Sequence, residues 1–250
     1  MRSQLFVSLL KLNLTQFGLA KIGVICVSVF WISTIVMALV ASPVQAKEIN
    51  QLKTNIATKP TITSTRTILV FGDSLSAGYG MQQAQSWPAL LEQKLAQNKS
   101  SYAPFKVVNA SISGETTSGG LARFSAALAT HKPNIVIIEL GANDGLRGLA
   151  IAEMQTNLSK MIVQAKIANA KVLLVGMKIP PNYGLKYSKN FSAAYTDLAK
   201  QHNIALVPFL LESVAGKPEL VQADGLHPLA VAQPKLLENV RLKLETLLNE

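Results

Sequence analysis

The sequence predicts an α/β protein built on a parallel β-sheet with helices on both faces. Short apolar runs alternate along the chain with longer segments whose apolar residues recur at helical spacing. Such alternation is typical of strand–helix–strand units, in which the strands are parallel and buried. The chain of 250 residues has an apolar fraction of 49%, which is ample for one core, and we find no internal repeat and no second domain.

The elements can be assigned in chain order from these patterns. Strands are expected at Ile68–Phe71, Lys106–Ala110, Ile135–Leu140, Val172–Met177 and Leu206–Phe209. Helices are expected at Trp87–Gln97, Gly119–Thr130, Ala152–Ala168, Phe191–His202 and Pro234–Leu248. The third strand is the most apolar, yet it contains Glu139, which we interpret as a paired structural carboxylate without a catalytic role.

Residues 1–46 are predicted to be a signal peptide. Three basic residues and no acid precede Lys47, and Ile22–Val40 is almost unbroken apolar sequence. Val44-Gln45-Ala46 then has the small residues that signal peptidase prefers at its cleavage site. The alternative is an uncleaved anchor, because the 19 residues of the apolar run are enough to span a bilayer.

On either interpretation the rest of the chain is exported, and we expect a periplasmic protein. Residues 47–66, rich in Thr, Lys and Asn, are predicted to be a flexible spacer before a catalytic domain at residues 67–250. The only cysteine, Cys26, lies within the leader, so we expect no disulfide.

The net charge of +10 falls to +7 once the three basic residues of the leader are removed. This excess favours weak association with an anionic membrane surface. Nucleic acid is not an expected partner, since the chain has no long Lys/Arg run and no basic patch interleaved with aromatic residues. We expect a monomer that acts on a small molecule.

Polar motifs follow four of the predicted strands or lie near their ends. Gly72-Asp73-Ser74 directly follows the first strand, Gly114 comes after the second, and Asn143 comes after the third. Asp224-x-x-His227 follows the fifth. In a doubly wound sheet the loops at the carboxyl ends of the strands meet at one edge, where ligands bind. The four motifs are therefore expected to converge.

Their residue types fit nucleophilic catalysis by a serine. Ser74 needs a base to take its proton as it attacks, and His227 is the best candidate because imidazole ionises near neutral pH. Asp224, three residues earlier, is placed to hold the imidazole in one tautomer. The backbone N–H groups of Ser74 and Gly114 and the side-chain amide of Asn143 are the candidate donors to an oxyanion.

Each motif alone also has an ordinary structural interpretation. Gly-Asp-Ser can cap a helix, Asp-x-x-His can form a turn, and Gly141-x-Asn143-Asp144 can be a simple loop. Their occurrence together, in this order and after successive strands, favours the catalytic interpretation.

These motifs resemble the four blocks of the SGNH, or GDSL, hydrolase superfamily. Within it, the chain resembles the bacterial periplasmic enzymes that act as acyl-CoA thioesterase, arylesterase and lysophospholipase. The resemblance covers the chain from about Thr67 to its end and includes Gly72–Tyr79, Ser86–Leu91, Val108–Gly114, Gly120–Arg123, Glu139–Gly148, Ala168–Ala170, Asn182–Gly184 and Asp224–Pro228.

The resemblance implies a flavodoxin-like three-layer α/β/α sandwich with a five-stranded parallel sheet, and no metal or cofactor. It also implies Ser74, Asp224 and His227 as the catalytic residues, with Ser74, Gly114 and Asn143 in the oxyanion hole. Two positions depart from the family pattern. Ala142 replaces a frequent second glycine and is expected to narrow the pocket floor, whereas Glu115 replaces a usual aspartate and is expected to have a mild effect.

The predicted activity is hydrolysis of fatty acyl oxyesters and thioesters, including lysophospholipids. Leu146, Ile179, Tyr183 and Leu185 are the expected substrate-binding residues. The loop Ile179–Leu185 follows the fourth strand on the side of Ser74, and its alternative role is that of a rigid turn fixed by two prolines.

Three other functions are less consistent with the sequence. A carbohydrate-acetyl esterase would need a small acyl pocket with polar contacts, which the apolar loop residues disfavour. A catalytically silent, membrane-tethered binding module is disfavoured because all four catalytic residue types are present. A flavodoxin-like cofactor binder is disfavoured because no Gly-rich phosphate turn follows the first strand.

Overall fold

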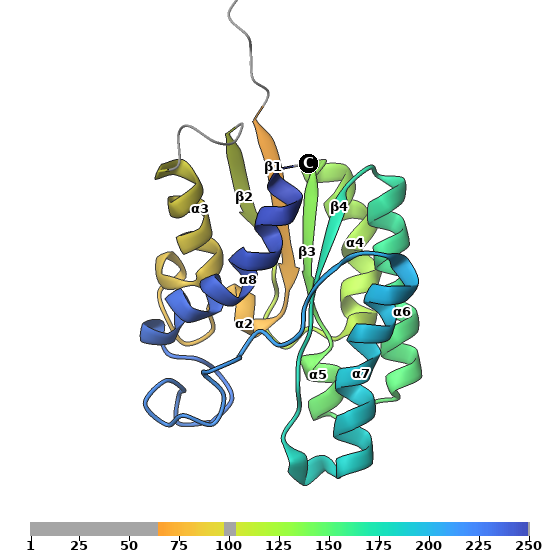
Figure 1. The fold of residues 1–250 in the computed structure, drawn as a ribbon, viewed down its shortest axis with the longest axis vertical. Helices are drawn as coiled ribbons and strands as arrows, with labels where there is room; N and C mark the ends of the chain where they lie inside the picture. The colour runs from red at the N-terminus through yellow and green to blue at the C-terminus, as the bar shows by residue number, and fades with distance from the viewer. Residues whose placement is uncertain (1–64, 98–103, 250) are drawn as a thin grey trace, which may run out of the picture. The chain divides into compact units, whose positions relative to one another are not determined.

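The computed structural model describes residues 65–97 and 104–249; the predicted leader and almost all of the spacer lie outside these residues. A five-stranded, all-parallel sheet forms the centre, with strand order β2-β1-β3-β4-β5 (Figure 1). Its strands are β1 (Arg66–Gly72), β2 (Phe105–Asn109), β3 (Ile135–Glu139), β4 (Lys171–Val175) and β5 (Ala205–Val207). The predicted α/β class and the five parallel strands are confirmed.

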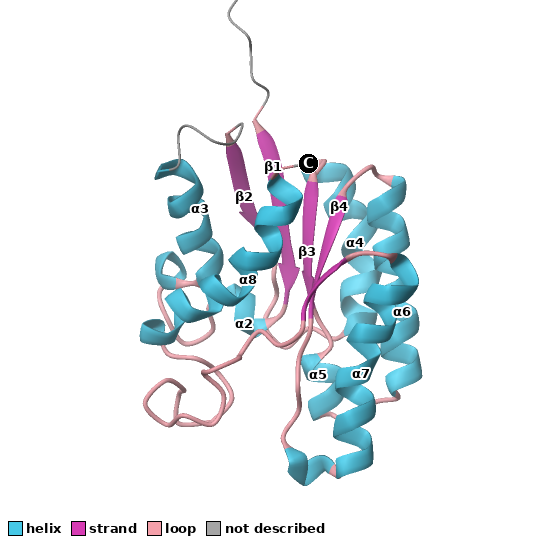
Figure 2. Cartoon of the chain, viewed as in Figure 1, coloured by secondary structure: helices cyan, strands magenta, loops and turns pink. Residues whose placement is uncertain are grey.

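Helices cover both faces of this sheet, so that the described residues form three layers (Figures 1 and 2). One face carries α3 and α8, which contact each other, and the opposite face carries α4, α6 and α7. The longer helices are α3 (Trp87–Gln97), α4 (Thr117–His131), α6 (Ile151–Ile167), α7 (Leu185–His202) and α8 (Gln233–Leu248). Two short α-helices, α2 (Ser74–Ala77) and α5 (Ala142–Leu146), follow β1 and β3. The 3₁₀ turns are η1 (Gln83–Gln85), η2 (Pro181–Tyr183) and η3 (Ala230–Ala232).

The strand order places a topological switch point between β1 and β3. From β1 the chain crosses to β2 on one side, and from β3 it proceeds to β4 and β5 on the other. Loops that leave the carboxyl ends of β1 and β3 therefore diverge and leave a crevice, which is where open α/β sheets bind ligands. The register aligns Gly72 with Glu139, so both strands end at the same level.

The two central strands form the middle of the core. All four side chains of Ile68–Phe71 are fully buried, and β3 is buried along its whole length. Continuous apolar strands of this kind are expected where helices cover both faces of a parallel sheet. Phe71 packs edge-on against Phe124 of α4 at a ring separation of 4.9 Å, which ties that helix to the sheet.

Several boundaries differ from the sequence-based expectation. The largest difference is at α7, which begins at Leu185 and not at Phe191. Residues 185–190 are solvent-exposed or half-exposed and carry no apolar stripe, so the sequence pattern does not reveal this part of the helix. The short helices α2 and α5 were not expected, since helices of four and five residues show no periodicity. None of the helices built from residues 65–97 and 104–249 has both the length and the apolar character needed to cross a membrane.

Candidate active site

The turn after β1 presents Ser74 as the first residue of α2. Asp73 caps this helix, with its Oδ1 accepting the Leu75 N–H at 3.0 Å, and Gly78 ends it in the left-handed conformation at φ 78°. In the Gly-Asp-Ser motif the helix cap is therefore Asp73, and the Ser74 hydroxyl is not used for capping. Ser74 lines a cavity, and its relative exposure is 9%.

Ser74, His227 and Asp224 form one hydrogen-bonded chain. His227 Nε2 lies 2.9 Å from Ser74 Oγ, and His227 Nδ1 lies 2.6 Å from Asp224 Oδ2. A carboxylate can only accept, so Nδ1 carries the proton and Nε2 is left to accept from the serine hydroxyl. This is the orientation that a general base requires.

Asp224 is held as a carboxylate by donors from its own turn. Its Oδ1 accepts the backbone N–H groups of His227 and Leu226 at 3.0 and 2.9 Å. The His227 N–H contributes most to lowering the pKa of Asp224, which falls to about 2. The His227 ring and the Leu226 N–H lower this pKa further, whereas partial burial raises it. Asp224 therefore stays ionised throughout the neutral range.

A second set of contacts fixes the turn that carries His227. The Gln222 N–H donates to the His227 carbonyl at 2.7 Å, and Val221 and Pro228 form an isolated antiparallel bridge. The Gln222 side-chain amide donates to the Tyr79 carbonyl at 2.8 Å, and the Tyr79 ring lies 4.5 Å from the imidazole. The turn after β1 and the turn that bears the histidine are thereby tied together.

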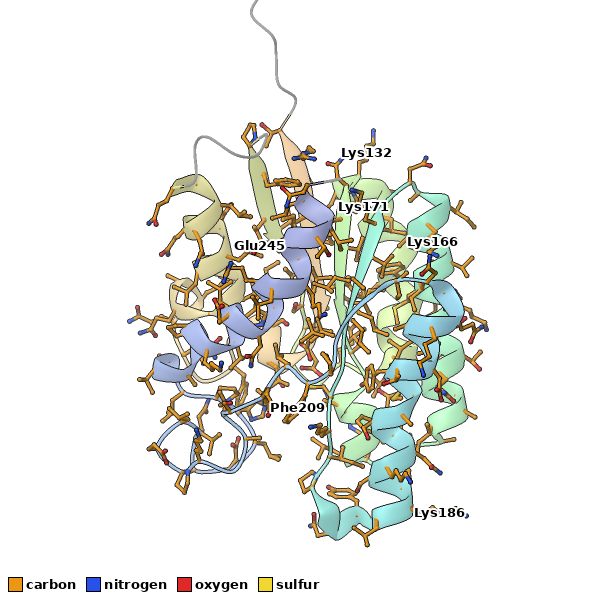
Figure 3. All side chains as sticks on the ribbon, in the orientation of Figure 1. Lys132, Lys166, Lys171, Lys186, Phe209 and Glu245 are labelled. Atoms are coloured by element: carbon orange, nitrogen blue, oxygen red, sulfur yellow. The ribbon has the colours of Figure 1, made fainter. Side chains whose placement is uncertain are left out.

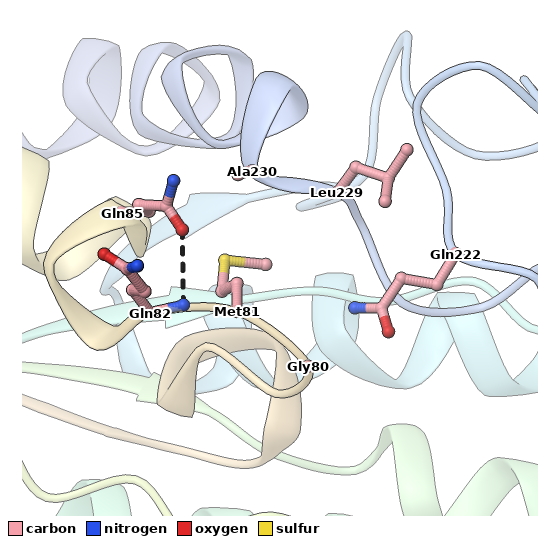
Figure 4. Close-up of a pocket in the computed structure, with 7 residues that line it drawn as sticks. All are labelled: Gly80, Met81, Gln82, Gln85, Gln222, Leu229 and Ala230. Carbon is pink, nitrogen blue, oxygen red and sulfur yellow. Dashed lines mark hydrogen bonds between the residues drawn. The ribbon is translucent and has the colours of Figure 1, made fainter.

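A hollow of about 600 Å³ adjoins Gln222 (Figure 4). It is lined by Gly80, Met81, Gln82, Gln85, Gln222, Leu229 and Ala230. None of the hydrogen-bonded Ser–His–Asp residues is in this wall, and we therefore place the chemistry elsewhere.

Ser74 instead opens into a cavity of about 560 Å³, within the range of about 300–1,000 Å³ typical of small-molecule sites. His227 and Asn143 share its wall. The apolar part of the lining consists of Leu75, Ala142, Leu146, Met177, Ile179, Pro180, Phe209, Leu211, Ala215 and Leu226. The Ala142 methyl group is thus part of the wall, where it takes up space that a glycine would leave empty.

Of the four residues predicted to bind substrate, the structure brings Leu146 and Ile179 to this cavity but neither Tyr183 nor Leu185. Leu185 is 81% exposed, because it starts α7 and is not part of the loop as expected. Its neighbour Lys186 lies at the outer end of α7, away from Phe209 near the centre of the molecule (Figure 3).

Sequence reasoning missed the side of the cavity that comes from the chain after β5. Phe209, Leu211 and Ala215 lie there, in the segment between β5 and the His227 turn. The rule that ligands bind beyond the carboxyl ends of parallel strands could have identified these apolar residues, since they directly follow the last strand.

The candidate oxyanion donors come from the segments that directly follow β1, β2 and β3. Gly114 adopts φ 78°, a backbone conformation that favours glycine. Crowding is not the reason for glycine here, because an added Cβ would meet only Arg147 Nη2, at 3.8 Å. Its carbonyl accepts from Arg147 Nη2 at 2.9 Å. Gly114 is not in the cavity wall itself but lies next to Glu115, which contacts Asn143.

Asn143 is oriented by two acceptors. Its Nδ2 donates to the Glu115 carbonyl at 3.0 Å and to Asp73 Oδ2 at 3.2 Å. The Glu115 side chain forms an ion pair with Arg123, so the glutamate is accommodated at this position. With acceptors on both sides, the amide presents its NH₂ end toward the nucleophile turn.

Among the residues that the structure describes, no cluster of three or more His, Cys, Asp or Glu side chains could hold a metal ion. The arrangement provides a nucleophile, a base, an orienting carboxylate and hydrogen-bond donors beside an apolar cavity. These parts define a serine hydrolase on a doubly wound α/β sheet.

A family comparison specifies this class. Residues 70–233 match the model of the GDSL-like Lipase/Acylhydrolase family, and the chain belongs to that family. It is similar to Esterase TesA of Pseudomonas aeruginosa, with 53% identity over 183 residues, which are 73% of this chain and 90% of the relative. It is 46% identical to Thioesterase 1/protease 1/lysophospholipase L1 of Escherichia coli over 183 residues, which cover 73% of this chain and 85% of the relative.

The fold is similar to that of solved esterases. The psychrotrophic esterase EstA from Pseudoalteromonas sp., in a structure inhibited by monoethylphosphonate, matches with a TM-score of 0.70 and 43% identity. The match covers 74% of this chain and all of the esterase chain. The predicted family and enzyme class are thereby confirmed.

Proposed function

We propose that this enzyme hydrolyses fatty acyl oxyesters and thioesters through an acyl-enzyme on Ser74. The observation that carries the proposal is the Ser74–His227–Asp224 chain, with hydrogen-bond distances of 2.9 and 2.6 Å, whose serine and histidine line a largely apolar cavity. The names of the two relatives, an esterase and a thioesterase and lysophospholipase, support this substrate class.

In the first half-reaction Ser74 Oγ attacks the acyl carbonyl while His227 Nε2 takes the hydroxyl proton. Asp224 stabilises the resulting imidazolium and keeps Nδ1 protonated. The tetrahedral intermediate then collapses as His227 passes the proton to the leaving alcohol or thiol. In the second half-reaction His227 takes a proton from a water molecule as the water oxygen attacks the acyl-Ser74 carbonyl. The new tetrahedral intermediate collapses with breakage of the acyl–Oγ bond, His227 returns the proton to Ser74 Oγ, and the fatty acid is released.

The oxyanion is bound by the N–H groups of Ser74 and Gly114 and by Asn143 Nδ2. In the ligand-free geometry both amide hydrogens of Asn143 already have acceptors, Glu115 and Asp73. The bond to Asp73, at 3.2 Å, is the longer of the two, and it is the one that the oxyanion would share. A charged oxygen competes well for this donor, whereas a neutral ester oxygen competes poorly, so the contact strengthens in the transition state.

The acyl chain is assigned to the apolar part of the cavity. Ile179 and Leu146 come from the loops after β4 and β3, and Phe209 comes from the segment after β5. A carbohydrate-acetyl esterase would place polar groups there, and this lining disfavours it.

A panel of acyl p-nitrophenyl esters and acyl-CoA thioesters of graded chain length tests the assignment. We expect kcat/KM to rise from acetyl to longer chains, because more apolar surface is buried in the cavity. A fluorophosphonate should add one equivalent to the wild type and none to Ser74→Ala. Labelling of Ser74→Ala equal to wild type would contradict the nucleophile, and a strict preference for acetyl esters would contradict the acyl assignment.

We further propose that the chain is exported and cleaved after Ala46, so that the mature protein starts at Lys47, acts as a monomer in the periplasm and associates weakly with anionic membrane surfaces. The support is the apolar run followed by Val44-Gln45-Ala46, together with the net positive charge. N-terminal sequencing of the exported protein tests the cleavage. Recovery of the intact leader in the membrane fraction would favour the anchor instead.

A further inference from the structure

Glu139 lies beneath the nucleophile turn at the end of β3 and is fully buried. Its Oε2 accepts the Ser76 hydroxyl at 2.7 Å and the Asp73 N–H at 3.4 Å, so it contacts the turn on both sides of Ser74. A Cβ on Gly72 would lie 2.6 Å from this oxygen. The glycine of the motif is therefore needed to admit the glutamate side chain.

A second carboxyl group and a phenol hydroxyl lie close to the Glu139 side chain. Asp73 faces it from the turn after β1, and the Tyr195 hydroxyl lies near it from α7. Among the ion pairs formed by the described residues, none involves Glu139 or Asp73. Burial, and next the charge of Asp73, raise the pKa of Glu139 well above its usual value.

Asp73 is the second buried acid of this pair. Burial raises its pKa to about 7, opposed by the Leu75 N–H, the charge of His227 and the Asn143 amide. The Glu139 carboxyl group accepts the Asp73 N–H at 3.4 Å, and the charge of the Asp73 carboxyl group acts on it directly. Two adjacent carboxyls in one buried site share a proton, which stays on the less well solvated member.

We propose that Glu139 is a positioning residue that acts as a neutral acid: it donates a hydrogen bond to the Asp73 carboxylate, and Asp73 in turn orients the Asn143 amide toward the oxyanion. The inference deepens the proposed function and rests on it. Glu139 Oε1 is buried and has no hydrogen-bond partner among the described residues, which costs far less free energy for the oxygen of a neutral acid than for that of a carboxylate.

The donor count explains why Asp73 must be the ionised partner. Its Oδ1 accepts from the Leu75 N–H and its Oδ2 accepts from Asn143 Nδ2, so both oxygens are needed as acceptors. An ionised carboxylate repels the oxygen end of the Asn143 amide and binds its NH₂ end. A proton on Asp73 would remove this discrimination, whereas a proton on Glu139 preserves it.

Three variants test the arrangement. Glu139→Gln places a carbonyl at the Oε2 position and an NH₂ donor toward Asp73, which mimics the neutral acid, and we expect it to keep kcat within about threefold of wild type. Glu139→Leu removes both functions. Asp73→Asn keeps the shape of the side chain but has only one oxygen for two donors, the Leu75 N–H and the Asn143 amide. With that oxygen bound to Leu75, its NH₂ group would face the NH₂ group of Asn143. For this variant, and for Glu139→Leu, we expect kcat to fall about 10–100-fold, less than complete loss of an oxyanion donor, with KM nearly unchanged.

Infrared spectroscopy reads out the proton directly. The difference spectrum of wild type minus Glu139→Gln at neutral pH should show the carbonyl stretch of one protonated carboxylic acid. Absence of that band, an equal loss of kcat in Glu139→Gln and Glu139→Leu, or wild-type kcat in Asp73→Asn would each overturn the inference. If Glu139→Leu does not fold, the other two variants and the spectrum still decide. A wild-type protein that is folded yet neither hydrolyses esters nor reacts with a fluorophosphonate would refute the proposed function instead.

Discussion

Replacing Thr117 by valine tests the buried link that holds α5, and with it Asn143, against α4. The Thr117 hydroxyl donates to Asp144 Oδ1 at 2.6 Å and accepts from Asn157 Nδ2 at 3.2 Å. Thr117 is fully buried, and Asp144 and Asn157 have exposures of 4% and 8%. Valine has almost the same shape as threonine, so the substitution removes two hydrogen bonds without making a cavity.

The cost follows from the two groups left without their partner. A hydrogen bond to a carboxylate contributes about 1.5–3 kcal/mol, and a neutral one about 0.5–1.5 kcal/mol. Asp144 keeps the Thr117 N–H at 2.8 Å, so it is not wholly stranded. We therefore expect Thr117→Val to lower the free energy of unfolding by about 2–4.5 kcal/mol.

Urea denaturation measures this change. With a slope of about 2 kcal/mol/M, the midpoint should fall by about 1–2 M while the slope stays constant. The matched control is Thr156→Val, at the residue before Asn157. The Thr156 hydroxyl is exposed and only donates to the Ala152 carbonyl. Its effect should stay within about 0.5 kcal/mol. A loss below about 1 kcal/mol for Thr117→Val would refute the reasoning, because it would mean that the buried carboxylate and amide do not need the hydroxyl.

Three further predictions concern the site. Asn143→Ala should lower kcat about 10²–10³-fold with KM nearly unchanged in steady-state ester hydrolysis; a raised KM with intact kcat would make Asn143 a substrate contact. Gly145→Ala should cost about 1–3 kcal/mol in urea unfolding, since its Cβ would lie 2.5 Å from the Phe191 ring, and no measurable loss would show that the ring moves aside. Asp224 has a folded pKa of about 2 against a usual 3.8, so its contribution to stability is present above about pH 4 and lost as the pH falls toward 2. Asp224→Asn should reduce the acid destabilisation in that window, and an unchanged pH dependence of unfolding would contradict the low pKa.

The fold could be predicted from sequence because the central strands are buried on both faces. Ile68–Phe71 and Ile135–Glu139 are nearly continuous apolar runs, and such runs identify strands of a covered parallel sheet. The short helices α2 and α5 and the first turn of α7 carry no apolar periodicity and so gave no signal. The start of α7 is fixed instead by backbone geometry at Gly184, whose φ is 94°.

The part of the candidate site that could be predicted consists of residues with distinctive chemistry that follow the ends of strands. Ser74, Asn143 and His227 were identified in this way, and the structure places them around one cavity. Tyr183 and Leu185 were proposed as pocket residues from position alone, and helix α7 directs Leu185 into solvent. Glu139 could be recognised as unusual, but sequence does not reveal that its partners are a hydroxyl group and a second carboxyl group.

The two halves of the catalytic apparatus are attached to the fold with different strength. Ser74 and Asn143 sit on short helices that leave neighbouring central strands, whereas His227 sits in a long connection after β5 held by one antiparallel bridge and a few turn contacts. Amide hydrogens of β1 and β3 should therefore exchange with solvent only when the whole domain unfolds, and those around His227 should exchange through local opening. Under mild denaturing conditions the enzyme would then lose its base while its nucleophile remains in place, so inactivation would precede unfolding.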